Sequence, residues 1–183
     1  MSMPSLMVLN QVALSNTIRR LWVDNSQWIR AYVYSILYGI GDREAIEARL
    51  GRVAEGLGMF FEQYYGEEIG RKVSSNYMRY VQELARMAEA YRDGNVALES
   101  TQREVLYDIA DELAALYAHV NRFFDQPTIQ IMLYELINNT EKEITSILIG
   151  NYTQEIEAHD QLMDQAYRLA DETASGIYRQ FRI

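Results

Sequence analysis

The side chains that could do chemistry in this sequence are few, and most of them are carboxylates. The 183 residues include two histidines, His119 and His159, and no cysteine. Without cysteine, neither a disulfide nor a thiolate metal site can form. Di-iron sites in helical bundles use the spacing Glu-x-x-His, and neither histidine has a glutamate three residues before it. We therefore predict no metal ligand and no cofactor.

Of the two histidines, His159 is the one whose position could indicate a functional role. It falls on an apolar stripe of the last predicted helix and follows Glu155 by four residues, which puts both side chains on one helix face. A ligand role is one interpretation. The other, which is commoner, is a core or partly exposed histidine bonded to a neighbour.

Several carboxylates recur near the predicted apolar stripes. A cluster of them could bind a metal or take part in acid–base catalysis. More often such charges flank a bundle core and face water, and we expect that here. The residues are Asp24, Asp111, Glu112, Asp160, Asp164, Asp171 and Glu172, with Arg30 and Arg168 as potential partners. No glycine-rich nucleotide loop or nucleophile elbow is present, so we predict no catalytic residue.

The elements that must position these side chains are helical. Only two prolines occur, Pro4 and Pro127, and the sequence shows almost no alternating apolar pattern. Breaks divide the chain into six expected helices, at 6–38, 43–64, 67–92, 96–124, 127–149 and 152–181. We predict an all-α fold, an antiparallel helical bundle of the ferritin-like or four-helix-bundle type, formed by a single domain over residues 1–183.

Local signals add detail to these six helices. Asp42, Asn95 and Asn151 are placed as N-caps, and Gly94 and Gly150 suit the left-handed turns that end the preceding helices. Three glycines, at positions 51, 56 and 58, predict a broken or irregular second helix, since glycine destabilises a helix.

The later predicted helices contain a weak internal sequence repeat. Met, Gly-Asn and Ala-Asp-Glu occur in the same order from 78 to 112 and from 132 to 172. This order predicts a duplicated αα-hairpin.

Composition limits the classes of partner. The net charge is −9, which disfavours nucleic acid and anionic lipid as partners. No stretch is long enough to span a membrane, and the first eighteen residues lack a basic signal-peptide start. We expect a cytoplasmic protein that forms a homodimer.

The most informative functional signal is an interruption in the first helix. Leu21, Trp28, Tyr32 and Ile36 share one apolar stripe, and Asn25 falls on the same stripe. An amide in such a position either forms part of the wall of a polar pocket or bonds a core tyrosine. Both interpretations remain open at this point.

Short motifs along the chain resemble a family of small, functionally uncharacterised all-helical bacterial proteins that are common in spore-forming Gram-positives. They include "LW…W.R" at 21–30, "YYG" at 64–66, "YDIADELA" at 107–114, "GNY" at 150–152 and "GIYRQF" at 176–181. Some relatives carry the label acetylglutamate kinase, but this chain has no kinase loop. The resemblance implies histidines at the places of Asn25, Tyr80 and Leu136, and this chain has replaced all three.

Two functional hypotheses follow. The first is a non-enzymatic bundle that binds a small ligand or a protein partner. The second is a metal-binding protein or metalloenzyme on a ferritin-like bundle, with ligands that the sequence does not reveal. The candidate residues for a ligand pocket are Asn25, Trp28, Tyr80, Leu136 and His159.

Overall fold

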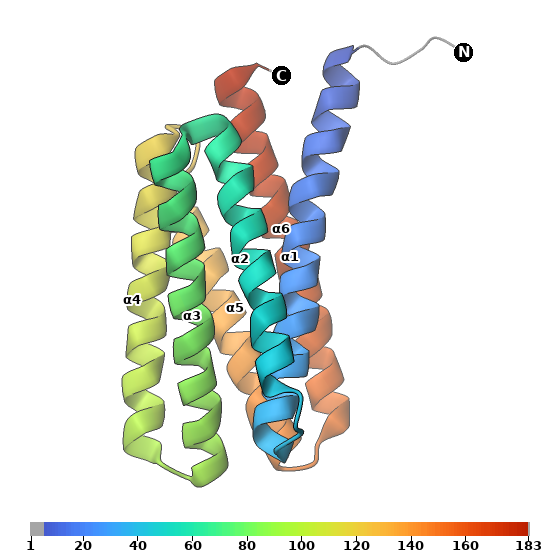
Figure 1. Cartoon of the computed structure of the whole chain (residues 1–183), viewed down its shortest axis with the longest axis vertical. Helices are drawn as coiled ribbons and strands as arrows, with labels where there is room; N and C mark the ends of the chain where they lie inside the picture. The colour runs from blue at the N-terminus through green and yellow to red at the C-terminus, as the bar shows by residue number, and fades with distance from the viewer. Residues whose placement is uncertain (1–5, 183) are drawn as a thin grey trace, which may run out of the picture.

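The computed structural model describes residues 6–182, and their side chains from residue 10 onward (Figure 1). It contains six helices and, within these residues, no strand: α1 (Leu6–Tyr38), α2 (Arg43–Tyr65), α3 (Glu67–Asp93), α4 (Val96–Val120), α5 (Gln126–Leu148) and α6 (Tyr152–Phe181). The prediction of an all-α fold with six helices is confirmed, and the bounds of most helices agree within one or two residues.

The helices run up and down, so that each is antiparallel to the next, and α1 packs against α6 (Figure 1). One apolar core extends between all six helices. In α1 the predicted stripe faces this core, because Leu21, Tyr32 and Ile36 are buried. Asn25 lies on the same face and is 5% exposed.

The α2 helix is continuous, so the prediction that its glycines break it is wrong. A Cβ atom added to Gly58 would lie 2.9 Å from the Gly70 carbonyl oxygen, and one added to Gly70 would lie 2.6 Å from the Gly58 oxygen. A Cβ at Gly56 would lie 2.7 Å from a methyl of Leu21. These glycines therefore let α2 approach α3 and α1 closely, and packing between helices outweighs their low helix propensity.

The turns before α4 and α6 are built alike. Asn95 and Asn151 each accept a hydrogen bond from a backbone N–H three residues on, at 3.2 Å, which confirms both N-caps. Gly94 and Gly150 have φ of 67° and 72°, as predicted for left-handed helix ends. The similarity of the two turns agrees with the expected duplicated αα-hairpin. That the α3–α4 and α5–α6 hairpins superpose stays a prediction.

Two predictions at helix ends need correction. Asp42 is the N-cap residue of α2, as predicted, but its side chain makes no capping bond, and its carboxylate instead accepts a hydrogen bond from the Ser35 hydroxyl of α1 at 2.7 Å. The α4 helix ends at Val120 rather than at residue 124. There the Asn121 side chain accepts from the Phe123 N–H at 2.9 Å, a local turn that competes with the helix.

Within residues 6–182, no helix has both the length and the apolar character needed to cross a membrane.

Candidate functional site

Asn25 is held by a tyrosine of α3. Its amide oxygen accepts a hydrogen bond from the Tyr77 hydroxyl, and both side chains are buried. Burial raises the pKa of Tyr77 well above 10, so the phenol remains a donor at neutral pH. A buried amide with such a partner satisfies its hydrogen-bonding need. The interruption in the α1 stripe is thus explained in part by a bond to a core tyrosine.

Asn25 also lines a cavity inside the bundle. The cavity has a volume of about 40 Å³, and Tyr80 of α3 and Leu136 of α5 line it together with Asn25. The three positions identified in the sequence therefore share one space. Since a single water needs roughly 10–15 Å³, the cavity can hold a very small group of atoms.

The lining of the cavity is mostly apolar. Its apolar side chains come from α1, α4, α5 and α6, and its polar ones are Asn25, Ser26, Asn76, Tyr77, Tyr80 and Thr140. Burial raises the pKa of Tyr80 to about 12, and a hydrogen bond with Thr140 opposes this shift. The hydroxyl of Tyr80 is therefore a neutral donor at physiological pH.

The other two candidate residues lie outside this lining. Trp28 is half-buried, and the Arg49 guanidinium lies 5.2 Å from the centroid of its ring. His159 is buried on α6, three residues before the cavity residue Leu162. The structure thus brings Asn25, Tyr80 and Leu136 together, and it places His159 about one helical turn away from the cavity.

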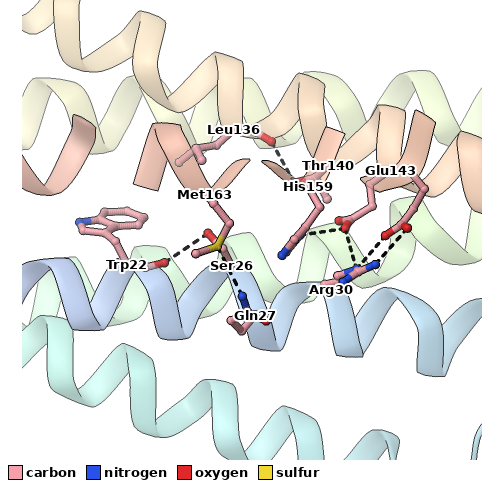
Figure 2. Close-up of polar contacts among 10 residues, drawn as sticks. Trp22, Ser26, Gln27, Arg30, Leu136, Thr140, Glu143, His159 and Met163 are labelled. Carbon is pink, nitrogen blue, oxygen red and sulfur yellow. Dashed lines mark hydrogen bonds and ion pairs between the residues drawn. The ribbon is translucent and has the colours of Figure 1, made fainter. Parts of the chain in front are cut away.

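His159 belongs to a cluster of charged side chains between α1, α5 and α6 (Figure 2). Its Nδ1 lies 3.1 Å from Glu143 Oε1. Arg30 donates two hydrogen bonds to Glu155, at 2.7 and 3.0 Å, and its Nε lies 3.5 Å from Glu143 Oε1. His159 therefore bonds a neighbour, as the commoner interpretation holds, but that neighbour is Glu143 rather than Glu155.

The cluster is unusual because its carboxylates are buried. The side chains of Glu143 and Glu155 are 0% and 1% exposed, while that of Arg30 is 33% exposed. Burial raises the pKa of Glu143, against the opposing effect of the His159 contact. The hydrogen bond with Glu155 raises the pKa of Arg30. Two buried atoms, Glu143 Oε2 and His159 Nε2, have no hydrogen-bond partner.

Glu143 was missed as a candidate, although the sequence holds a signal for it. Leu136, Thr140, Glu143 and Ile147 follow one another at steps of four, three and four residues, which keeps them on one helix face. All four are buried. The carboxylates that the sequence did single out are all at least partly exposed, as expected.

Metal chemistry finds little support in this cluster. Among residues 6–182, no group of three or more His, Cys, Asp or Glu side chains could hold a metal ion. Arg30 contacts both buried glutamates, so part of their negative charge is already compensated.

A comparison of the chain with protein-family models, characterised proteins and solved structures finds no match. The resemblance to small bacterial helical proteins therefore stays a prediction.

Proposed function

We propose that this protein is a non-enzymatic helical bundle that binds a small, mostly apolar ligand in the cavity beside Asn25. The observation that carries the proposal is the convergence of Asn25, Tyr80 and Leu136 on one cavity with few polar groups. Apolar walls with a small number of placed hydrogen-bonding groups are typical of ligand sites.

The size of the cavity limits the ligand. Drug-sized ligands occupy pockets of roughly 300–1,000 Å³, and an apolar cavity of about 150 Å³ binds benzene. The cavity here has about 40 Å³. On this scale the space as it stands admits about one or two non-hydrogen atoms, so a ligand of a few non-hydrogen atoms with one polar group binds only if side chains of the lining shift.

A cavity-filling variant tests the proposal. The ¹³C-methyl signals of Ile29 and Ile137, which both line the cavity, would be followed by NMR during titration with 1-propanol. We expect saturable shifts in the parent protein. Leu136→Phe should abolish them, because the larger side chain occupies the cavity. Ile131→Phe is the matched control, because Ile131 lies on α5 but is 56% exposed, and it should bind like the parent.

Shifts that never saturate in the parent, or that persist unchanged in Leu136→Phe, would contradict the proposal.

The cytoplasmic location and the homodimer expected from the sequence belong to the same proposal. Sedimentation analysis of the purified protein would test the homodimer.

A further inference from the structure

The charges around Glu143 do not balance. Glu143 and Glu155 carry two negative charges when ionised, and Arg30 supplies one positive charge. Tyr80 of α3, whose pKa burial and the Glu143 charge raise to about 12, stays neutral. Unless His159 gains a proton, a net negative charge is therefore left in the interior, where an uncompensated charge is costly.

The two unpartnered atoms of the cluster are both acceptors. His159 Nδ1 faces the Glu143 carboxylate at 3.1 Å, so we assign the imidazole proton to Nδ1. His159 Nε2 then presents a lone pair, and Glu143 Oε2 is a free carboxylate oxygen. The side chains of His159 and Glu143 are 9% and 0% exposed, so water cannot freely solvate either atom. With Glu143 ionised and His159 neutral, the group that would partner these two atoms is therefore a donor.

Neither member of this acceptor pair lines the cavity, but each follows or precedes a lining residue by about one helical turn. Thr140 and Leu162 line the cavity, and each is three residues from a member of the pair, Glu143 on α5 and His159 on α6. Figure 2 shows the Glu143 and His159 side chains pointing toward Arg30 of α1. Glu143 is also close enough to Tyr80 to raise the pKa of its phenol by charge repulsion.

We propose that the cavity binds a short primary alkylamine, with Glu143 and His159 as acceptors for its protonated amino group. This inference rests on the proposed function, whose ligand class it narrows. The ammonium supplies both the missing positive charge and the missing N–H donors. The alkyl chain then lies against the apolar lining of the cavity. The partly exposed Arg30 covers the cluster and is the side chain that must move to admit the ligand.

A proton competes with the ammonium for the same negative charge. Burial raises the pKa of Glu143, and the groups facing it are Arg30 of α1, Tyr80 of α3, and Glu155 and His159 of α6. Amine affinity should therefore increase as the pH rises through the pKa of Glu143, as long as the amine itself stays protonated.

The experiment compares propylammonium chloride with 1-propanol, at equal ionic strength set with sodium chloride, by the same methyl NMR titration at neutral pH. We expect propylammonium to saturate the parent protein at a concentration at least about tenfold lower than 1-propanol, because a charge-assisted hydrogen bond strengthens binding. Glu143→Gln should remove this preference. Glu157→Gln makes the same charge change at an exposed position of α6 and should keep it.

The outcomes separate the two proposals. If the parent binds 1-propanol at least as well as propylammonium, the amine inference is wrong and the cavity still binds small ligands. Saturation by neither compound would overturn both. A preference for the amine that survives in Glu143→Gln would show that Glu143 is not its acceptor. The comparison within the parent needs no variant, so a destabilised Glu143→Gln cannot hide the result.

Discussion

Glu141 and Glu143 lie two residues apart on α5 and point to opposite sides of the helix. Glu141 accepts hydrogen bonds from Arg103 of α4 and from the Tyr91 hydroxyl of α3, and its side chain is 17% exposed. Glu143 is completely buried beside His159. A step of two residues rotates a helical side chain by about 200°. One helix therefore carries two carboxylates with opposite responses to pH.

Glu143→Gln should change the pH dependence of stability. Burial raises the folded-state pKa of Glu143 above its ordinary value of 4.5. The stability associated with the protonated group is thus fully present below pH 4.5 and is lost as the pH rises through the folded pKa. Gln stays neutral throughout. We expect the free energy of unfolding of Glu143→Gln to improve relative to the parent between pH 4 and pH 7, as measured by urea denaturation. If the difference in unfolding free energy between parent and variant stays the same from pH 4 to pH 7, the pKa of Glu143 is not raised by folding.

Glu141→Gln should behave in the opposite way. Burial raises the pKa of Glu141, but hydrogen bonds from Arg103 and Tyr91 outweigh burial and leave it below 4.5. The stability from this carboxylate is present above pH 4.5 and is lost as the pH falls through the lowered pKa. At pH 7 the variant should be about 1 kcal/mol less stable, since the pair is partly exposed. The same urea measurements should show this deficit shrinking below pH 4.5. A constant deficit would mean that ionisation of Glu141 does not stabilise the fold.

Gly70→Ala tests the close approach of α2 and α3. The added methyl would meet the Gly58 carbonyl oxygen at 2.6 Å and the Glu62 Cβ at 2.8 Å. We expect a loss of about 1–3 kcal/mol of stability despite the higher helix propensity of alanine. Gly51→Ala is the matched control, because a Cβ there meets nothing within 4 Å, and it should stabilise by up to about 1 kcal/mol. Thermal melts would compare the variants, and two stabilised variants would refute the packing argument.

Placing imidazoles around the cavity should create a metal site. In Asn25→His/Tyr80→His/Leu136→His, the three side chains would face one space and could bind zinc through neutral nitrogens. Without metal the variant should be destabilised by roughly 1–3 kcal/mol for each polar group buried without a partner. Added zinc should then raise its melting temperature in a concentration-dependent way.

The control for this design moves one histidine out of the cavity. Trp28→His/Tyr80→His/Leu136→His carries the same number of imidazoles, but Trp28 does not line the cavity. A zinc response of equal size in both variants would show that convergence on the cavity is not the cause.

Local signals in the sequence account for most of the fold. Gly94-Asn95 and Gly150-Asn151 set two turns through their own backbone and side chains, and both could be predicted. Gly58 could not be interpreted alone, because its role depends on Gly70 of another helix. The missing capping bond of Asp42 could not be predicted for the same reason, since Ser35 of another helix donates to its carboxylate.

Some residues of the candidate site could likewise be predicted from the sequence, and others could not. Asn25 stood out because one amide interrupts an apolar stripe, and the resemblance to bacterial helical proteins pointed to Tyr80 and Leu136. Glu143 did not stand out, because a carboxylate on an inward stripe is interpretable only when its partners are known. Those partners are Arg30 and His159, which lie on two other helices. Helix periodicity assigns a side chain to a face, but it does not identify the residues opposite.

The packing of α1 against α6 bears on the order of folding. The other extensive contacts join helices that are consecutive in the chain, whereas this one joins the first helix to the last. Contacts between consecutive helices need only short loops to close, while the α1–α6 seam must close nearly the whole chain. We therefore expect the five hairpins between consecutive helices, from α1 to α6, to form early and the contact between α1 and α6 to form late. Arg30 of α1 meets Glu155 of α6 on this seam, so the buried charges come together only when folding is almost complete.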